Sequence, residues 1–320
     1  LALALVEEPA AIGVLRASAE DQVERFSLTS GIGAGTELSI MRGWSLGTRF
    51  GLTGVDPGTA GVWLTPSAAH SPYLAFTNGG DGLALGGEIS PGTIWRVGLA
   101  RAEPPDADLE VGRRSVAVAE LVRTWDQGAA VAVQVGSLAE EASLLDTAGG
   151  GALALDGAAT GFVGLAARMP IIAAEDGERG LHLFGHLNHG VTRAAVTSRG
   201  LIRDISTLHS TAFAAGVAQT GVFRSFDQLA LSVAQPIRID AGSMTVDLPV
   251  ARAFDGTIER RRERVSLAPA GRELDVELAY RLPLAANQQL SVNWLTRIQP
   301  DHDPTAPPSH AIGAKWSARF

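Results

Sequence analysis

The sequence of 320 residues contains no cysteine. A disulfide framework and a thiolate metal site are therefore excluded. A chain without thiols suits a protein that crosses an oxidising compartment, where wrong pairings would form. Every hydrophobic stretch is also interrupted by Arg, Asp, Glu or Gly, so the chain has no apolar run of about 18 residues. A transmembrane helix is excluded as well.

Other residue types and motifs that are scarce or absent narrow the possible class of protein further. Aromatic residues make up 6% of the chain, with two tyrosines, which is few for the interfacial belts of membrane barrels. Lys315 is the only lysine. The net charge of −8 and the pI near 5.4 argue against a nucleic-acid-binding protein. No G-T-S or H-E-x-x-H motif occurs, so these hydrolase signatures are lacking and no enzyme is predicted.

Apolar residues, in contrast, are abundant. They make up 46% of the chain, and the mean hydropathy is +0.14, so the protein must bury or coat a large apolar surface. The C-terminal stretch shows how. Counting back from Phe320, one alternating set is apolar and includes Trp316, while the other set includes Lys315 and Arg319. Successive side chains of a strand point to opposite faces, so the stretch predicts either a membrane-barrel strand or a half-buried strand of a soluble protein.

A regular rhythm of segments of about ten residues begins at Asp81, which is the spacing of membrane strands. We predict strands near 81–89, 92–101, 113–124, 127–138, 158–169, 179–190, 208–218, 226–236, 242–253, 270–283, 287–298 and 309–320. The expected fold is therefore all-β, an antiparallel transmembrane β-barrel of about 12 strands over residues 81–320, in the outer membrane of a Gram-negative bacterium. A soluble β-sandwich is the alternative.

The first 80 residues are harder to interpret. Residues 1–35 predict a linker with a helix over 10–25, because Pro9 and two glutamates precede apolar residues at spacings of three and four. This helix is either a plug in the barrel lumen or an amphipathic helix on a surface. Residues 36–80 contain short strand-like runs between Gly and Pro turns. They predict a short β-rich connector outside the barrel or extra barrel strands.

Charged residues alternate with apolar ones over 272–282. Three consecutive inward carboxylates would be costly in a dry core, whereas a hydrated lumen removes the cost. We expect these carboxylates to bind a linker helix through ion pairs, to assist cleavage of the linker, or only to keep the lumen hydrated and the strand register fixed. The predicted lumen-lining charges are Glu273, Asp275, Glu277, Arg281, Arg297, Lys315 and Arg319.

Two connections conflict with the predicted arrangement of barrel strands. Counted back from a periplasmic C-terminus, residues 139–157 and 190–207 fall where short periplasmic turns are expected, yet both are long. Either they fold into small helices or the strand count is wrong by two.

Outside this row of charges, three clusters of His, Asp or Arg residues are candidate metal-binding or ligand-binding sites. His182, His186 and His189 have metal-like spacing, but strand residues four apart lie about 13 Å apart, so we predict polar lumen residues and no metal site. A Pro-rich segment contains Asp301, His302 and Asp303, and it predicts an acidic surface loop.

Guanidinium groups pair bidentately with phosphate. Arg260, Arg261 and Arg262 are therefore predicted to contact lipopolysaccharide.

Several blocks of sequence resemble one family. They are Leu229 to Arg238 (LALSVAQPIR), Val246 to Ala251 (VDLPVA), Arg264 to Tyr280 (RVSLAPAGRELDVELAY) and Ala311 to Phe320 (AIGAKWSARF). Together they are similar to the C-terminal β-barrel (translocator) domain of subtilisin-like serine protease autotransporters of alphaproteobacteria. The resemblance covers about 250 residues and is strongest after Ser225.

The resemblance implies a type V secretion translocator that exports or anchors an N-terminal passenger at the cell surface. Its implied partners are its own passenger, outer-membrane lipid and lipopolysaccharide, and the barrel assembly machinery, which reads Trp316 and Phe320. Ala318 departs from the pattern, because many outer-membrane barrels carry an aromatic residue there. Protease activity would belong to the passenger. We expect a monomer with no cofactor and no nucleic-acid partner; the alternative function is a stand-alone outer-membrane channel for small solutes.

Overall fold

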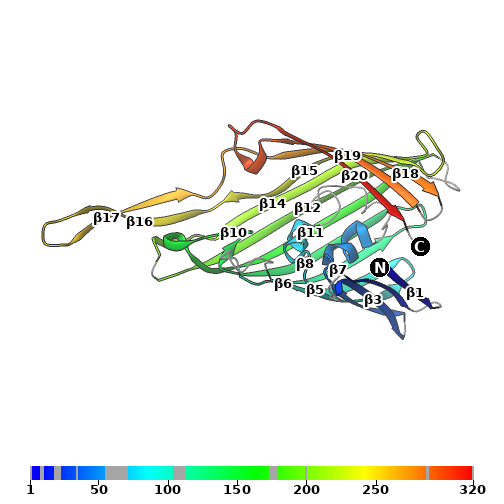
Figure 1. Ribbon diagram of the computed structural model, residues 1–320, viewed down its shortest axis with the longest axis horizontal. Helices are drawn as coiled ribbons and strands as arrows, with labels where there is room; N and C mark the ends of the chain where they lie inside the picture. Colours follow the sequence, from blue (N-terminus) through cyan, green and yellow to red (C-terminus); the bar gives the residue numbers. More distant parts are fainter. Residues whose placement is uncertain are drawn as a thin grey trace.

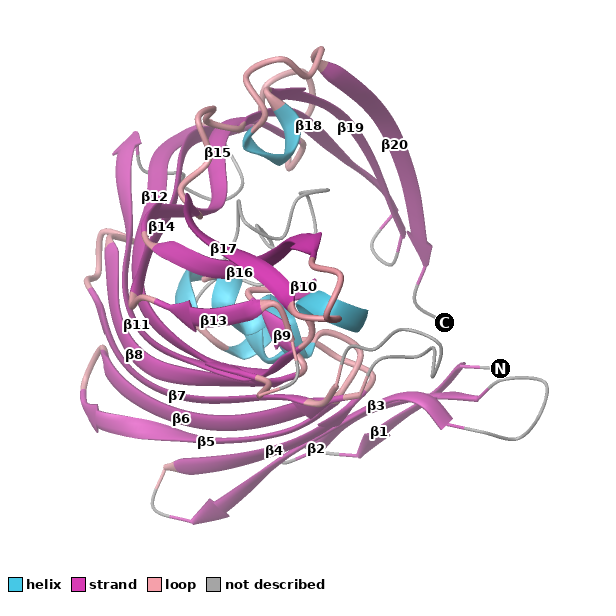
Figure 2. Cartoon of the chain, turned by 90° about the vertical axis from the view of Figure 1, so that its left-hand side faces the viewer, coloured by secondary structure: helices cyan, strands magenta, loops and turns pink. Residues whose placement is uncertain are grey.

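The computed structural model describes residues 2–7, 11–17, 23–33, 35–54, 71–103, 112–172, 179–198, 200–285 and 288–318. Their main feature is a single sheet of fifteen strands within these residues, which curls around a lumen (Figure 2). We call this curled sheet the barrel. No helix in the described residues is long and apolar enough to cross a membrane.

All neighbouring barrel strands are antiparallel and follow the chain order, so the edge strands β1 and β20 run in the same direction. No hydrogen-bonded pairing joins these two edges within the described residues. The barrel strands are β1 (Ala2–Glu7), β2 (Ala11–Ala17), β3 (Val23–Gly33), β4 (Thr36–Arg42), β5 (Asp81–Ser90), β6 (Thr93–Ala102), β7 (Arg114–Thr124), β8 (Ala130–Glu141), β11 (Leu155–Ile172), β12 (Gly180–Val196), β14 (Leu208–Thr220), β15 (Gln228–Ala241), β18 (Leu274–Ala285), β19 (Gln288–Ile298) and β20 (Ser309–Ala318).

Alternation along each strand separates the two faces of the sheet. On β11, Phe162 is 2% exposed and faces the lumen, whereas its neighbours Val163 and Leu165 are 53% and 50% exposed on the outside. The same outward apolar face continues around the barrel, for example at Leu231 and Trp294. An apolar exterior that is left uncovered suits lipid, not water. The soluble β-sandwich does not describe this fold.

The connections differ between the two ends of the barrel. One end has turns of two to seven residues, such as 91–92 and 221–227. The connections from β4 onwards at the other end have ten residues or more, and they include 142–154 and 197–207. We call these the short-turn end and the long-loop end. The two long connections that conflicted with the predicted parity therefore lie with the other long ones.

The predicted count of about 12 barrel strands is wrong, because the sheet has fifteen strands in the described residues. Eleven of the twelve predicted strands are in the barrel, and the twelfth, near 242–253, leaves it. The helix predicted within residues 10–25 is also wrong, because the described residues there form β2 and the beginning of β3. The sequence from Leu1 to Val6 alternates Leu with Ala or Val, which is a strand pattern in a stretch that was predicted only as a linker. β4 supplies the remaining extra barrel strand, in place of an external connector.

A three-stranded arm projects from the long-loop end (Figure 1). It consists of β16 (Ser243–Arg252) and β17 (Ile258–Ser266), with β13 (Ile202–Ile205) paired along β16. Its base packs on the rim of the barrel, where Ile202 and Val246 join a buried cluster with Leu155 and Leu208. The connection 142–154 lies near this base and contains β9 (Ser143–Leu144), β10 (Thr147–Ala148) and η5 (Gly151–Leu153).

The connection between β4 and β5 lies inside the curl of the sheet (Figure 2). Its described residues, 43–54 and 71–80, form three short 3-10 helices, η1 (Leu46–Arg49), η2 (Gly51–Gly54) and η4 (Pro72–Thr77). We call these residues the lumenal segment. Among the described residues, the largest buried cluster lies where this segment meets the barrel wall. The lumen therefore holds the described residues of this connection, 43–54 and 71–80, whereas the predicted lumenal plug was the N-terminal helix.

Candidate functional site: the lumenal segment and its polar cavity

The lumenal segment is seated on the wall by apolar side chains. Leu46, Phe50 and Leu74 are at most 1% exposed and pack in one cluster with Val118 on β7. Gly98 on β6 makes the approach possible, because a Cβ there would lie 2.7 Å from Phe50 Cζ. Other wall residues of this cluster are Met41, Ala84, Ala100, Val116, Leu138 and Phe162.

Tyr73 attaches the other half of the segment to the wall further along the same sheet, at β11 and β14. Its ring stacks on Phe162 with centroids 4.8 Å apart, and its hydroxyl lies 3.0 Å from Ser210 Oγ on β14. Gly190 leaves room for this hydroxyl, because a Cβ there would lie 2.4 Å from it. Tyr73 is fully buried, and burial raises the pKa of its hydroxyl to about 12 despite the hydrogen bond with Ser210.

A buried carboxylate holds the middle of the segment. The Gly51 N–H donates to Glu120 Oε2 at 2.5 Å, and Gln134 Nε2 donates to the same oxygen at 2.6 Å. Arg96 Nη1 donates to Glu120 Oε1 at 3.0 Å. The Glu120 side chain is fully buried, and a buried charge is tolerated only when it is paired and hydrogen-bonded. Glu120 therefore joins β6, β7, β8 and the lumenal segment through one side chain.

A polar cavity of about 560 Å³ lies beside the segment, between it and the inner face of β4 to β6. Its charged lining consists of Glu37, Arg49, Glu88 and Arg96. Arg49 extends from η1 and donates to Thr29 Oγ1 at 2.5 Å, so it is held against the wall. The cavity also borders the turn residues Gly35 and Gly92, which places it toward the short-turn end. Its lining carries charges of both signs.

The predicted lumenal row lies on the far side of the barrel. The register pairs Glu277 with the lumen-facing Ser232, and Glu273, Asp275 and Glu277 are at most 4% exposed. Arg297 Nε donates to Glu273 Oε1 at 2.7 Å, and Asn293 Nδ2 donates to Glu277 Oε1 at 2.7 Å. Hydrogen bonds from the neighbouring strand β19 therefore hold Glu273 and Glu277 within the barrel wall.

The remaining predicted residues divide between the two faces. Arg281 and Lys315 face the lumen, because the register pairs them with Gln228 and Ser291. Trp316 is 59% exposed on the outer face, whereas Arg319 and Phe320 lie outside the described residues. His182 and His186 are buried at the lumen, while His189 is exposed on the other face, so only two of the three are polar lumen residues. In the described residues no group of three His, Cys, Asp or Glu could hold a metal ion.

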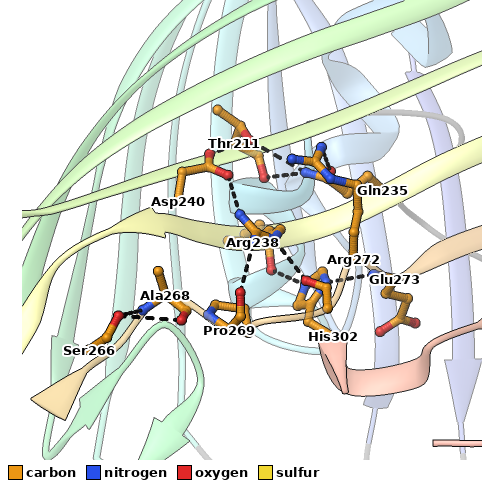
Figure 3. Close-up of polar contacts among 12 residues, drawn as sticks. Thr211, Gln235, Arg238, Asp240, Ser266, Ala268, Pro269, Arg272, Glu273 and His302 are labelled. Carbon is orange, nitrogen blue, oxygen red and sulfur yellow. Dashed lines mark hydrogen bonds and ion pairs between the residues drawn. The ribbon is translucent and has the colours of Figure 1, made fainter. Parts of the chain in front are cut away.

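At the long-loop end, polar contacts bind two connections to β15 (Figure 3). Arg238 Nε and Nη2 donate to the carbonyl oxygens of Gly271 at 3.0 Å and Pro269 at 2.7 Å. His302, at the end of η6 (Pro300–His302), accepts from the Glu273 N–H at Nδ1, 2.9 Å, so its Nε2 carries the hydrogen that faces the Ile237 carbonyl oxygen at 3.0 Å. The predicted acidic loop around His302 is therefore part of the rim.

The prediction that the chain lacks a G-x-S-x-G hydrolase motif is wrong. Residues 43–47 (GWSLG) match G-x-S-x-G, which in hydrolases places a reactive serine between a strand and a helix. Here Ser45 Oγ accepts a hydrogen bond from the Gly47 N–H at 3.1 Å and caps the four-residue helix η1. Its hydroxyl therefore has a structural role in starting the lumenal segment.

Comparison with known proteins identifies the architecture. No family model and no curated protein matches the sequence. The loop L8 deletion mutant of OmpT, an outer membrane protein of Vibrio cholerae, matches with a TM-score of 0.51 and 12% identity over 97% of this chain and 86% of that chain. OprB of Pseudomonas putida, in its high-pH structure, matches with a TM-score of 0.51 and 14% identity over 93% of this chain and 73% of that chain. The fold is that of outer-membrane β-barrel proteins.

Alkaline titration should weaken the native state through Tyr73. Below pH 10 the hydroxyl is protonated in both native and unfolded chains, so it has no effect on stability. Between pH 10 and about 12 the unfolded chain loses this proton while the buried hydroxyl keeps it, and each pH unit costs about 1.4 kcal/mol. Unfolding by urea in detergent micelles, measured from pH 8 to 12 for the protein and for Tyr73→Phe, should show this additional loss in the wild type alone. Parallel curves for the two proteins would contradict it.

Proposed function

We propose that this protein is an outer-membrane channel through which small hydrophilic solutes pass the lumenal segment. The observation that carries the proposal is the charged cavity beside a segment that lies in the lumen and packs against the barrel wall. Four charged side chains around a cavity of about 560 Å³ suit polar solutes, while the apolar exterior suits lipid. Short turns face the periplasm in such barrels, so the long-loop end is extracellular in this proposal.

The test is the conductance of the purified full-length chain in planar bilayers. Discrete steps of conductance, with a reversal potential in a salt gradient, are expected for an open path beside the segment. A chain that inserts without conducting at any voltage would reject the solute channel, and failure to insert would reject the membrane location.

Arg49 should set part of the ion preference of this path. Its guanidinium lines the cavity, and one unit charge acting across about 8 Å of water changes the energy of an ion by about 0.5 kcal/mol. The energies of cation and anion shift in opposite directions, so Arg49→Gln should shift the permeability ratio toward cations by about fivefold, measured as the reversal potential in a potassium chloride gradient. Arg42→Gln is the matched control, because Arg42 lies outside the lumen in an exposed pair with Asp81. An equal shift in both variants would remove Arg49 from the path.

A type V translocator is the second candidate function. The sequence blocks that resemble autotransporter barrels support it, and they include β15, β16, β18 and β20. Against it, the residues expected to form a lumenal linker helix supply strands β1 to β3. In this proposal a passenger precedes the chain, the assembly machinery inserts a monomeric barrel, and the barrel itself performs no bond chemistry. An epitope fused ahead of Leu1 should then reach the cell surface; its retention in the periplasm would reject the translocator.

A further inference from the structure

The arm carries a basic face that the solute path does not use. Thr245 and Asp247 on β16 pair in register with Arg264 and Arg262 on β17. Paired residues share a face of the sheet, and Arg260 lies on it too, because its guanidinium reaches Asp247. We call this the basic face of the arm. Its charged residues are Arg203, Asp204, Asp247, Arg260, Arg262 and Arg264.

The positive charge of this face is only partly neutralised. Asp247 is nearly buried and pairs with both Arg203, at 3.1 Å, and Arg260, at 3.7 Å. Arg262 and Arg264 form no ion pair with any described residue, and both are exposed. Four guanidinium groups thus face two carboxylates, and the two that lack an ion pair are neighbours on the same face.

The opposite face of the arm has a different character. Arg261 Nη2 lies 2.5 Å from Glu263 Oε1, so its charge is neutralised locally. Val246 and Leu248 share that face by register. The run from 260 to 262 therefore does not act as three adjacent groups, because alternation places Arg261 away from Arg260 and Arg262.

Hydroxyl groups stand beside Arg264 at the base of the arm. Arg264 Nε donates to Ser243 Oγ at 2.8 Å, and the Ser243 N–H donates to Ser206 Oγ at 2.9 Å. A notch of about 420 Å³ opens there, lined by Ser206, Thr207, Gly242, Ser243, Arg264 and Ser266. Guanidinium and hydroxyl donors together are suited to phosphate oxygens.

The position of the base fits the headgroup layer of a membrane. Along β15 the outward residues Leu231 and Val233 are apolar and exposed, whereas Arg238 and Asp240 follow toward the long-loop end. The apolar band thus ends before residue 242, where the arm begins. A strand of ten residues extends about 33 Å, so the arm that carries the basic face extends beyond the long-loop end of the barrel (Figure 1).

We propose that the basic face of the arm binds the phosphate groups of lipopolysaccharide in the outer leaflet. The charge complementarity of Arg262 and Arg264 and the hydroxyl-lined notch favour a phosphorylated glycolipid. The inference requires the outer-membrane location, but it does not depend on what passes through the lumen. A barrel that fails to conduct but binds the lipid would leave it intact.

The experiment measures binding of deep-rough lipopolysaccharide to the full chain in detergent. Arg262→Ala with Arg264→Ala should weaken binding about tenfold or more, because each lost charge-assisted contact corresponds to about tenfold. Arg261→Ala, on the opposite face, is the matched control and should stay within about twofold. Neither residue of the double variant has an ion pair in the described structure, so the arm should stay folded, which its resistance to protease can verify.

Dephosphorylated lipopolysaccharide separates phosphate recognition from attachment to the acyl chains. It should bind the wild type as weakly as the double variant binds the intact lipid. Equal affinity of wild type and double variant for the intact lipid would overturn the proposal, as would an equal loss in Arg261→Ala. Complete displacement of the lipid by inorganic phosphate would assign the notch to free phosphate instead and would also overturn it.

Discussion

Replacing residues 44–79 with a short Gly-Ser linker should increase the single-channel conductance several-fold. The segment leaves the wall and returns at adjacent points, because the Gly43 N–H donates to the Gly80 carbonyl oxygen at 2.8 Å. A short linker can therefore join β4 to β5 without moving either strand. The lumenal segment fills part of the cross-section of the lumen (Figure 2), so its removal should widen the path for ions.

The deletion also exposes wall residues that the segment covers. Val116, Val118, Leu138 and Phe162 would then face water in the lumen, so the variant should unfold at lower urea concentration than the wild type. Tyr73→Phe is the matched control, because it keeps the segment and its stacking and removes only the hydroxyl. Unchanged conductance in the deletion variant, with the barrel inserted and folded, would mean that the segment does not limit the path.

The barrel strands after residue 81 were predictable because a membrane strand carries its own signal. In Leu274–Ala285, apolar residues alternate with Asp275, Glu277 and Arg281, and the structure places the two sets on opposite faces. The same signal misplaced the strand near 242–253. β16 alternates as well, but its partner β17 carries charges on both faces, so the pair suits an arm in water and not a wall in lipid.

The lumenal segment could not be predicted from alternation. Leu46, Thr48, Phe50 and Leu52 have the spacing of a strand, yet the chain forms 3-10 turns because Gly43 and Gly51 have positive φ values of 69° and 68°. Such backbone conformations depend on glycine and interrupt a strand. The residues of the lumenal segment are apolar because they pack against the lumen wall. This contact joins distant parts of the chain, so alternation along the sequence does not reveal it.

Glu120 was the detectable signal that the sequence analysis missed. It lies in the apolar run VAVAELV of β7, and the strand alternation turns it inward. An acidic residue in such a run requires a partner, but the sequence does not say which one. Arg96 and Gln134 are opposite it only once the register is known. The role of Gly51 as a third partner depends on the segment folding into the lumen.

Removing the Glu120 carboxylate should therefore destabilise the barrel and release the lumenal segment together. In Glu120→Ala, the Arg96 guanidinium, whose side chain is 14% exposed, loses the Glu120 carboxylate, and the Gly51 N–H loses the same acceptor. Loss of one member of a buried ion pair costs about 3–5 kcal/mol. Urea unfolding of the barrel in detergent measures this cost, and added flicker in the single-channel current should report the freed segment.

The double variant Arg96→Met with Glu120→Leu separates charge from attachment. Replacing both members of a buried pair with apolar residues is often close to neutral for stability, so the double variant should recover most of the free energy of unfolding. It should not recover the quiet current, because the Gly51 N–H still has no carboxylate to bind. Recovery of both properties would show that the ion pair alone matters, and that the hydrogen bond from Gly51 does not hold the segment in place.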